Sequence, residues 1–528
     1  MPDLGSAFAP LRQRAFALLW LAAVAANIGG FMRDVASAWV VTEVAPSPVW
    51  VALVQAAATL PVFLLAIPAG VLADILDRRR LLIAVQLMLA GVSLALAALA
   101  TAQSLDLPAL LALAVLGGMG AALMQPTWQA VAPDLVGRAL VRDAVALNSL
   151  GINIARALGP AAGGLLLGLW GPATTFGLSA AGALLMIAAL WAWRRPPPEP
   201  DLLVEHFVGA LRAGLRYTRA SRELHRVLWR AAVFFGFSSA VWALLPLLAR
   251  RLLGGTAGFY GLLLGAVGAG AIVGALLLPR LRQRLGTEGL MTAAAAIVAA
   301  VLALLSQRPP QPLALALMAA LGVAWIAALT TLGGVAQAIF PSWVRGRGLA
   351  VYLTVFNGAL TLGSLAWGGV AEALGMPTAL HLAAAGLLAV AVLARRWPLP
   401  EGDAEQGPSS PWPAPRTQHA VGLDQGPVIV QLEYRVLPEH REAMVAALYD
   451  YGRVRRRDGA MAWGLAEDVE QPEVLLEWFV VEAWAEHLRQ HQRSTTRDAD
   501  LRAAVLRWHT GDTPPRVRHL LTVRRLSG

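Results

Sequence analysis

Long apolar runs fill most of the first 394 residues of the chain. Twelve such runs, each at least 20 residues long, alternate with short breaks of charged residues, proline or glycine. A helix needs about 20 mostly apolar residues to span a bilayer. The pattern therefore predicts an all-α membrane protein with twelve transmembrane helices, over residues 16–42, 49–73, 81–102, 107–131, 143–168, 172–193, 227–249, 257–279, 287–306, 312–335, 348–371 and 375–394.

The arginines between these runs predict an orientation. They gather at both ends of the apolar part and in every second loop, beginning with the cluster at 78–80. The other loops are short and nearly free of arginine, with Arg250, Arg251 and Arg308 as exceptions. Because cytoplasmic loops carry the excess of basic residues, we expect both termini in the cytoplasm. The chain is then a multi-pass protein of the bacterial plasma (inner) membrane.

The first and second sets of six helices repeat each other. Gly163-Gly164 recurs 205 residues later as Gly368-Gly369, and three other landmarks recur at nearly the same offset. Such six-plus-six duplications are typical of secondary transporters, in which the substrate binds between the halves. We expect transporter halves at 1–193 and 227–396, joined by a basic cytoplasmic bridge at 194–226.

Composition excludes several classes of protein. Hydrophobic residues make up 57% of the chain and charged residues only 14%, whereas soluble domains carry about 25% charged residues. The absence of cysteine excludes disulfides and thiolate metal sites, and the absence of lysine excludes an ATP-binding P-loop. The net charge of +10 arises in the apolar part, which favours cytoplasmic loops over nucleic-acid binding. No metal or cofactor is expected.

A charged motif joins the second and third runs. Gly70 permits close helix approach, Asp74 can accept hydrogen bonds at a helix end, and Arg78 and Arg79 follow within the basic cluster. This motif resembles the loop signature of the major facilitator superfamily, but Asp77 replaces a glycine of the general pattern. The resemblance implies that these residues form a conformational latch with the opposite half. The alternative is a solvated loop that only sets topology.

The fifth run contains the sequence Gly159-Pro160-Ala-Ala-Gly163-Gly164, preceded by Ala155. It resembles the motif that marks antiporters and exporters of the same superfamily, although Ala155 stands where that motif has its first glycine. Ordinary packing of small residues is the alternative. Together with residues 126–136 and 146–160, the motif resembles the branch of enterobactin-exporter-like proteins and secretion effectors, over roughly residues 10–395.

Charged side chains within the runs are costly in a bilayer and therefore mark candidate functional positions. Asp34 in the first run and Arg156 in the fifth are predicted to face the central cavity, and Asp34 is a candidate proton-coupling carboxylate. A structural ion pair of Asp34 with Arg33 or Arg156 is the alternative. Asn153 and Asn357 are candidate cavity donors or links between helices.

The last part of the chain has a soluble pattern. A proline-rich linker at 397–427 precedes residues 428–528, where 15 arginines balance 15 acidic residues. Alternation and helical periodicity predict the order strand-helix-strand-strand-helix-strand, a ferredoxin-like α+β unit.

This tail resembles the dimeric α+β barrels of the antibiotic-biosynthesis-monooxygenase type, through the run from Glu482 to His491. The resemblance implies a possible homodimer and a small pocket formed by Trp463, Trp478, Trp484 and His491. A metal site is not favoured, because no carboxylate motif accompanies the histidines.

The leading hypothesis is an efflux transporter of the major facilitator type. It would export a drug, siderophore or other secondary metabolite by alternating access, with proton antiport as the coupling. A membrane-tethered, cofactor-free monooxygenase coupled to transport is one alternative, and a transporter-like scaffold or sensor is another. The expected partners are lipid, a small-molecule substrate and protons.

Overall fold

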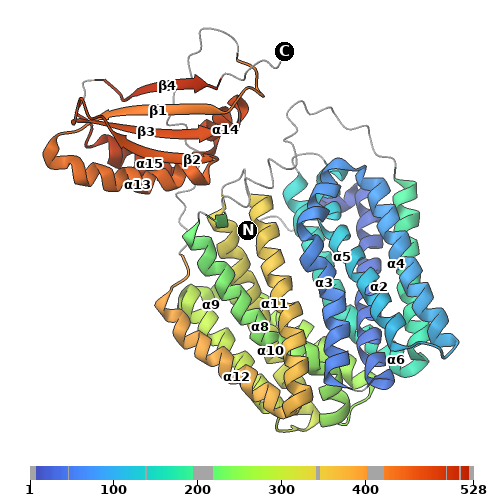
Figure 1. The fold of residues 1–528 in the computed structure, drawn as a ribbon. Helices are drawn as coiled ribbons and strands as arrows, with labels where there is room; N and C mark the ends of the chain where they lie inside the picture. Colours follow the sequence, from blue (N-terminus) through green and yellow to red (C-terminus); the bar gives the residue numbers. More distant parts are fainter. Residues whose placement is uncertain are drawn as a thin grey trace. The chain divides into compact units, whose positions relative to one another are not determined.

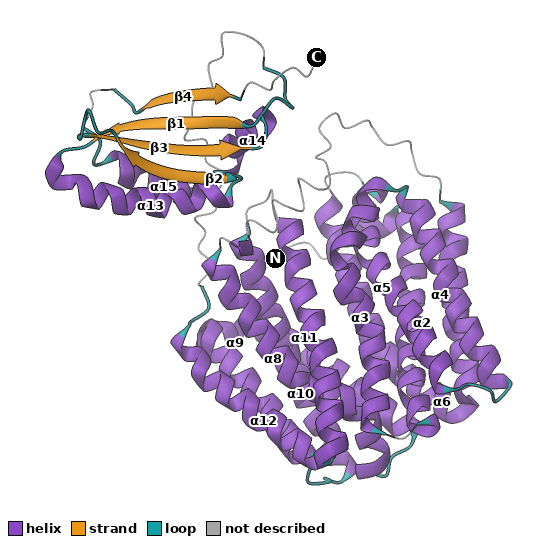
Figure 2. Cartoon of the chain, in the orientation of Figure 1, coloured by secondary structure: helices purple, strands orange, loops and turns teal. Residues whose placement is uncertain are grey.

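The computed structural model describes residues 8–45, 47–136, 140–193, 218–219, 221–340, 345–400, 421–494, 496–510 and 513–522. Its contacts divide the chain into a helical unit, which holds most of the first 399 residues, and a second unit that contains the tail from Pro400 onward. Figures 1 and 2 show the helical unit as a bundle and the tail as a sheet with helices.

Ten helices in the described ranges are long and apolar enough to cross a bilayer. They are α2 (Arg14–Val44), α3 (Pro48–Ile75), α4 (Arg78–Thr101), α5 (Leu107–Leu135), α6 (Val141–Ala192), α8 (Arg222–Leu247), α9 (Ala257–Leu305), α10 (Gln311–Ile339), α11 (Arg345–Leu374) and α12 (Met376–Leu393). Short helical segments adjoin them, namely η1 (Ala9–Arg12), the π-helical η3 (Leu248–Leu252) and η4 (Ala394–Arg396). The predicted helical membrane architecture is confirmed, and each predicted apolar run lies within a helix or a helix segment, or extends beyond it by two residues at most.

Two of the helices are about twice as long as the others because each contains a break. Gly171 in α6 and Gly286 in α9 have φ of 76° and 65°, a left-handed region that favours glycine. The two segments of α6 run back along each other, since Gly151 packs against Val24 of α2 and Gly182 packs against the next residue, Ala25.

The two ends of α9 are also close together. Gln311, which follows α9, donates a hydrogen bond from Nε2 to the carbonyl oxygen of Leu253, which precedes α9 (3.4 Å). α9 therefore doubles back at Gly286, as α6 does at Gly171. A single glycine makes the turn in each case, and no polar loop separates the two helical segments.

Polar side chains define where several helices begin. Asp77 accepts a hydrogen bond at Oδ1 from the backbone N–H of Arg80 (2.8 Å), and Asp106 and Thr256 cap α5 and α9 in the same way. Such caps satisfy N–H groups that a helix start leaves free. Asp77, where the superfamily pattern has glycine, thus replaces a flexible turn with a capped start of α4.

The tail contains a four-stranded sheet and three main helices. Its elements are β1 (Val428–Arg435), η5 (Pro438–His440), α13 (Arg441–Arg457), β2 (Ala462–Glu467), β3 (Val474–Val481), α14 (Trp484–Arg493), α15 (Thr496–Leu506) and β4 (Arg516–Leu521). The strands form one antiparallel sheet in the order β2-β3-β1-β4. Alternate residues of β1, from Val428 to Tyr434, are buried in the core.

A buried carboxylate crosses this core. Glu477 of β3 is fully buried and accepts hydrogen bonds from Tyr434 Oη (2.9 Å), Trp463 Nε1 (2.9 Å) and Arg455 Nε (3.3 Å). Arg455 is itself buried, and its guanidinium lies over the ring of Phe479 at 4.5 Å. Burial and the neighbouring carboxylate raise the pKa of Tyr434. The network joins β1, β2, β3 and α13.

We expect Glu477→Gln to destabilise the tail by about 3 kcal/mol, because it leaves the buried charge of Arg455 without its counter-charge. Hydrogen–deuterium exchange of the full-length protein measures this effect, as roughly 100-fold faster exchange of β1 and β3 amides. Glu433→Gln is the matched control, since Glu433 lies on β1 outside the buried network. Equal exchange in both variants would show that the ion pair does not stabilise the tail.

Candidate functional site

The glycines of the predicted antiporter motif lie where α6 meets its neighbours. A side chain added to Gly159 would lie 2.6 Å from Phe31 Cβ of α2, and one added to Gly163 would lie 2.8 Å from Met32 Cα. Gly164 instead faces the opposite half: a Cβ on Gly261 of α9 would lie 2.6 Å from the Gly164 Cα. The motif therefore brings α6 into backbone contact with helices of both halves.

The contact between α6 and α9 extends over several turns. A Cβ on Gly268 would lie 2.8 Å from Ala157 Cα, and one on Gly265 would lie 3.1 Å from Ala161 Cβ. Small residues thus face each other along both helices. This spacing leaves no room for any larger side chain at the crossing.

Polar contacts also connect the halves. Arg250 donates from Nη1 to Thr42 Oγ1 (3.1 Å), and Ser47 Oγ donates to Glu372 Oε2 (2.7 Å). These contacts lie beside the short loops, at the helix ends opposite the arginine clusters. Arg250, an exception to the arginine pattern in the sequence, is thereby explained as a contact between α2 and η3.

Asp34 pairs with its sequence neighbour. Arg33 donates to Asp34 Oδ1 from Nη2 (2.9 Å) and Nε (3.2 Å), and the Arg33 guanidinium lies against Gly117 of α5. The Arg33 side chain is 11% exposed, whereas that of Asp34 is 55% exposed. A side chain added at Gly30, one turn away, would meet nothing within 4 Å. Asp34 therefore borders open space while keeping its ion pair.

Arg156 and Asn153 share one face of α6. At 100° per residue, this face lies between the residues that contact α2 and those that contact α9, and away from the exposed Leu158 and Leu165. Asn357 of α11 donates from Nδ2 to the Leu353 carbonyl oxygen of its own helix (2.8 Å). The structure therefore places Arg156 and Asn153 together, and it gives Asp34 and Asn357 separate partners.

The predicted latch is described only in part. The surroundings of Gly70 and the side chain of Asp74 lie outside what the structure describes. Arg79 donates from Nε to the Leu190 carbonyl oxygen (2.7 Å) and from Nη2 to that of Trp191 (3.0 Å), at the end of α6. Arg79 thus stabilises a helix end within its own half, and Arg78 is half-buried beside it.

The tail does not gather the predicted pocket residues at one point. Trp463 is paired in register with Phe479 and faces the core, whereas Trp478 is paired with Gly464 and points to the opposite face of the sheet. Trp484 lies with the histidines instead, 5.3 Å from the His487 ring. The pairing register separates Trp463 from Trp478, so these two do not share a pocket within one copy.

Three histidines meet beside Trp484. The His487 ring lies 4.8 Å from that of His491 and 4.7 Å from that of His519. Burial lowers the pKa of His487 to about 3 and that of His491 to about 4, and it also lowers the pKa of His519. The rings of His487 and His491 are therefore uncharged at neutral pH. Sequence analysis missed His519, which only strand alternation and the β1–β4 pairing bring to this cluster.

No grouping of three or more histidine or acidic residues within the described ranges has the geometry of a metal site. The tail histidines pack ring against ring. The candidate polar residues of the helical unit, which are Asp34, Asn153, Arg156 and Asn357, are spread over α2, α6 and α11. The arrangement combines two helical halves with a small-residue contact between them.

Comparison with known proteins agrees with this arrangement. The sequence profile of a family described as transmembrane secretion effector matches residues 5–527. The chain is 24% identical over 49% of its length to the staphyloferrin A transporter of Staphylococcus aureus, and 34% identical over 39% to the enterobactin exporter EntS of Shigella flexneri. It is 26% identical over 68% to the multidrug efflux pump Tap of Mycolicibacterium fortuitum.

These matches span 65%, 48% and 90% of the three relatives, so the chain aligns with about half to two thirds of the length of the first two. Among solved structures, the nucleoside transporter NupG aligns with 72% of this chain and 99% of its own (TM-score 0.61, 11% identity). A bacterial homologue of the lysosomal transporter Spinster aligns with 73% of this chain and 97% of its own (TM-score 0.59, 16% identity).

The solved structures establish the transporter fold, and the family profile extends from the first helix through the tail. The predicted resemblance of the chain to the major facilitator superfamily is confirmed. The chain therefore belongs to the transmembrane secretion effector family of the major facilitator superfamily.

Proposed function

We propose that this protein is an efflux transporter that exports a siderophore or another small amphipathic compound by alternating access. The contact between α6 and α9 carries this proposal, because two rigid halves joined at one end can rock about that contact. The sequence similarity to proteins named as enterobactin exporter, staphyloferrin A transporter and multidrug efflux pump supports the substrate class.

We further propose twelve transmembrane spans, with both termini in the cytoplasm. The doubling back of α6 at Gly171 and of α9 at Gly286 supports this count, since each would contribute two spans. The arginine-rich ends are then cytoplasmic. On this orientation the halves touch at their outer ends, as an inward-facing transporter requires.

Asp34 is the proposed proton-coupling group. Its carboxylate is half exposed beside the space at Gly30, and only one of its oxygens accepts from Arg33. Protonation would weaken this ion pair and release Arg33 to other partners. Arg156, Asn153 and Asn357 are proposed to contact substrate, and the Gly70–Arg79 motif to act as the latch.

The tail is proposed to be a ferredoxin-like regulatory or dimerisation domain. Its order of elements and its sheet order β2-β3-β1-β4 support this assignment. β2 and β4 are edge strands, and exposed edges need a partner or cover. A second copy of the tail would supply that cover.

A substitution at the contact between the halves tests alternating access. Gly164→Ala adds a methyl group against the Gly261 backbone, which costs about 1–3 kcal/mol of packing energy. This cost shifts the equilibrium between the inward-facing and outward-facing states about fivefold or more. We expect the halves to separate at their outer ends. Crosslinking of Ser47→Cys to Glu372→Cys measures this, and the chain has no cysteine of its own to interfere.

Gly177→Ala is the matched control, because it adds the same methyl group to α6 where nothing lies within 4 Å. Gly261→Ala should reproduce the effect of Gly164→Ala from the opposite helix. Unchanged crosslinking in both contact variants would contradict the proposed rocking about α6 and α9.

Transport by inverted vesicles tests the function itself. With enterobactin and a cationic dye as probes, we expect proton-dependent uptake that Asp34→Asn lowers about tenfold, within the usual range of coupling free energies. Glu43→Gln is the matched control, because Glu43 lies on the same helix and accepts a hydrogen bond from Trp39 Nε1. Truncation after Pro400 should leave uptake intact, since Leu399 still packs on the helical unit.

Absence of uptake for every probe would remove the efflux proposal. Uptake that Asp34→Asn leaves unchanged would retain efflux and reassign Asp34 to a structural ion pair with Arg33.

A further inference from the structure

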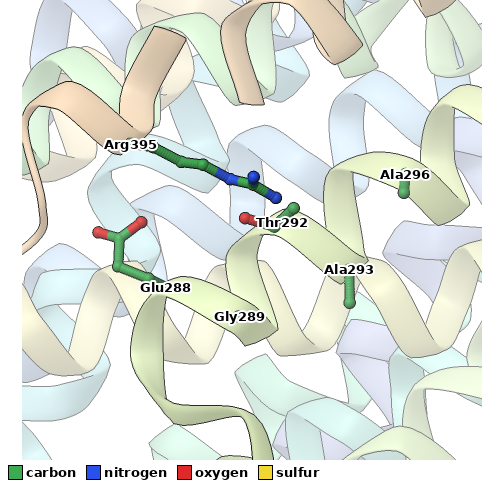
Figure 3. Close-up of a pocket in the computed structure, with 6 residues that line it drawn as sticks. All are labelled: Glu288, Gly289, Thr292, Ala293, Ala296 and Arg395. Atoms are coloured by element: carbon green, nitrogen blue, oxygen red, sulfur yellow. The ribbon is translucent and has the colours of Figure 1, made fainter. Parts of the chain in front are cut away.

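A cavity of about 610 Å³ lies in the second transporter half, close to the turn at Gly286. It is formed by the second segment of α9 and by η4, which follows α12, and its lining residues are Glu288, Gly289, Thr292, Ala293, Ala296 and Arg395. Figure 3 shows Glu288 at one end, Ala296 at the other and the Arg395 side chain between them. Small residues at positions 289, 293 and 296 leave the space open.

The surroundings of the cavity are apolar and exposed. Beyond Ala296, the same face of α9 continues to the exposed Leu304, and Leu388 and Val392 are exposed on α12. In a membrane protein such a surface faces the hydrocarbon of the bilayer. The contacts between the halves involve the first segment of α9, so this cavity is separate from the proposed substrate pathway.

The cavity is also lined by a positively charged side chain, that of Arg395. Glu288 already accepts hydrogen bonds from the buried Arg230 and from the Leu399 backbone N–H (2.5 Å), so its charge is compensated within the protein. Arg395 is exposed and forms no hydrogen bond or ion pair with any residue that the structure describes. Glu288, Arg230 and Arg395 together carry a net charge of +1. That charge lies on Arg395 and is available to a ligand.

We propose that this cavity binds one phospholipid of the inner leaflet. The Arg395 guanidinium binds the lipid phosphate through charge-assisted hydrogen bonds, and one acyl chain lies along Ala293 and Ala296. The exposed Trp397, two residues further on, marks the level of the headgroups. The inference rests on the proposed orientation, which places the end of α12 in the cytoplasmic leaflet, and not on export.

Native mass spectrometry of the full-length protein tests the proposal, with phosphatidylglycerol titrated into detergent micelles. We expect wild-type protein to retain one phosphatidylglycerol molecule, and Arg395→Gln to weaken its binding about tenfold, the effect of losing ~1.4 kcal/mol. Arg396→Gln is the matched control, since Arg396 is the adjacent exposed arginine and does not line the cavity. It should bind as wild type does.

A second pair of variants tests the acyl-chain groove without changing charge. Ala293→Leu fills the cavity and should weaken binding to a similar extent, whereas Ala300→Leu, exposed on α9 beyond the cavity, should not. Equal thermal unfolding of these variants in detergent confirms that each one folds.

Three outcomes would overturn the proposal. Equal weakening by Arg395→Gln and Arg396→Gln would indicate a diffuse attraction to anionic lipid. Displacement of the lipid by excess inorganic phosphate, with no effect of Ala293→Leu, would indicate a site for free anions. Binding that no variant changes would show that the cavity holds no lipid. Because none of these measurements uses transport, a failed efflux assay leaves the test unaffected.

Discussion

The close approach of α6 and α9 is the constraint on which the helical unit depends. A bilayer offers no hydrophobic driving force between helices, so their association relies on packing and on hydrogen bonds. Gly164 with Gly261 and Gly168 with Gly258 permit close backbone approach at the crossing, and alanines face Gly265 and Gly268 further along. A contact built from small side chains presents a smooth surface, which is compatible with the proposed rocking of the two halves. Arg250 with Thr42 and Ser47 with Glu372 add hydrogen bonds between the two halves beside the short loops.

Much of this architecture follows from the sequence, because the hydrophobic thickness of a bilayer fixes the length of each span. The twelve apolar runs coincide with helices for this reason, and glycine marks the reversals at 171 and 286. The sequence could not reveal how α6 divides its small residues between partners. Gly159, Gly163 and Gly164 look alike in the chain, yet only Gly164 contacts the opposite half. That difference depends on rotation about the helix axis, which local pattern does not determine.

The same limit applies to the charged residues. Arg33 and Asp34 are adjacent and would point to different sides of a helix by periodicity alone, but the long Arg33 side chain curls back to its neighbour. In the tail, alternation locates the strands, whereas pairing register decides which tryptophans share a face. Trp463 donates to the buried Glu477, while Trp478 lies on the other side of the sheet. The His487 cluster likewise required β4 to pair with β1.

The ion pair of Arg230 with Glu288 connects these levels of organisation. Glu288 follows the turn at Gly286, Arg230 belongs to α8, and Leu399 begins the segment that leads to the tail. One carboxylate therefore fixes two helices and the exit of the chain from the membrane unit. Because Glu288 is satisfied by these partners, the exposed Arg395 has no counter-charge among the residues that the structure describes and can bind an anion from outside the protein. In a bilayer, the nearest abundant anion at that depth is a lipid phosphate. The ion pair of Glu288 with Arg230 thus leaves the positive charge of Arg395 uncompensated by Glu288.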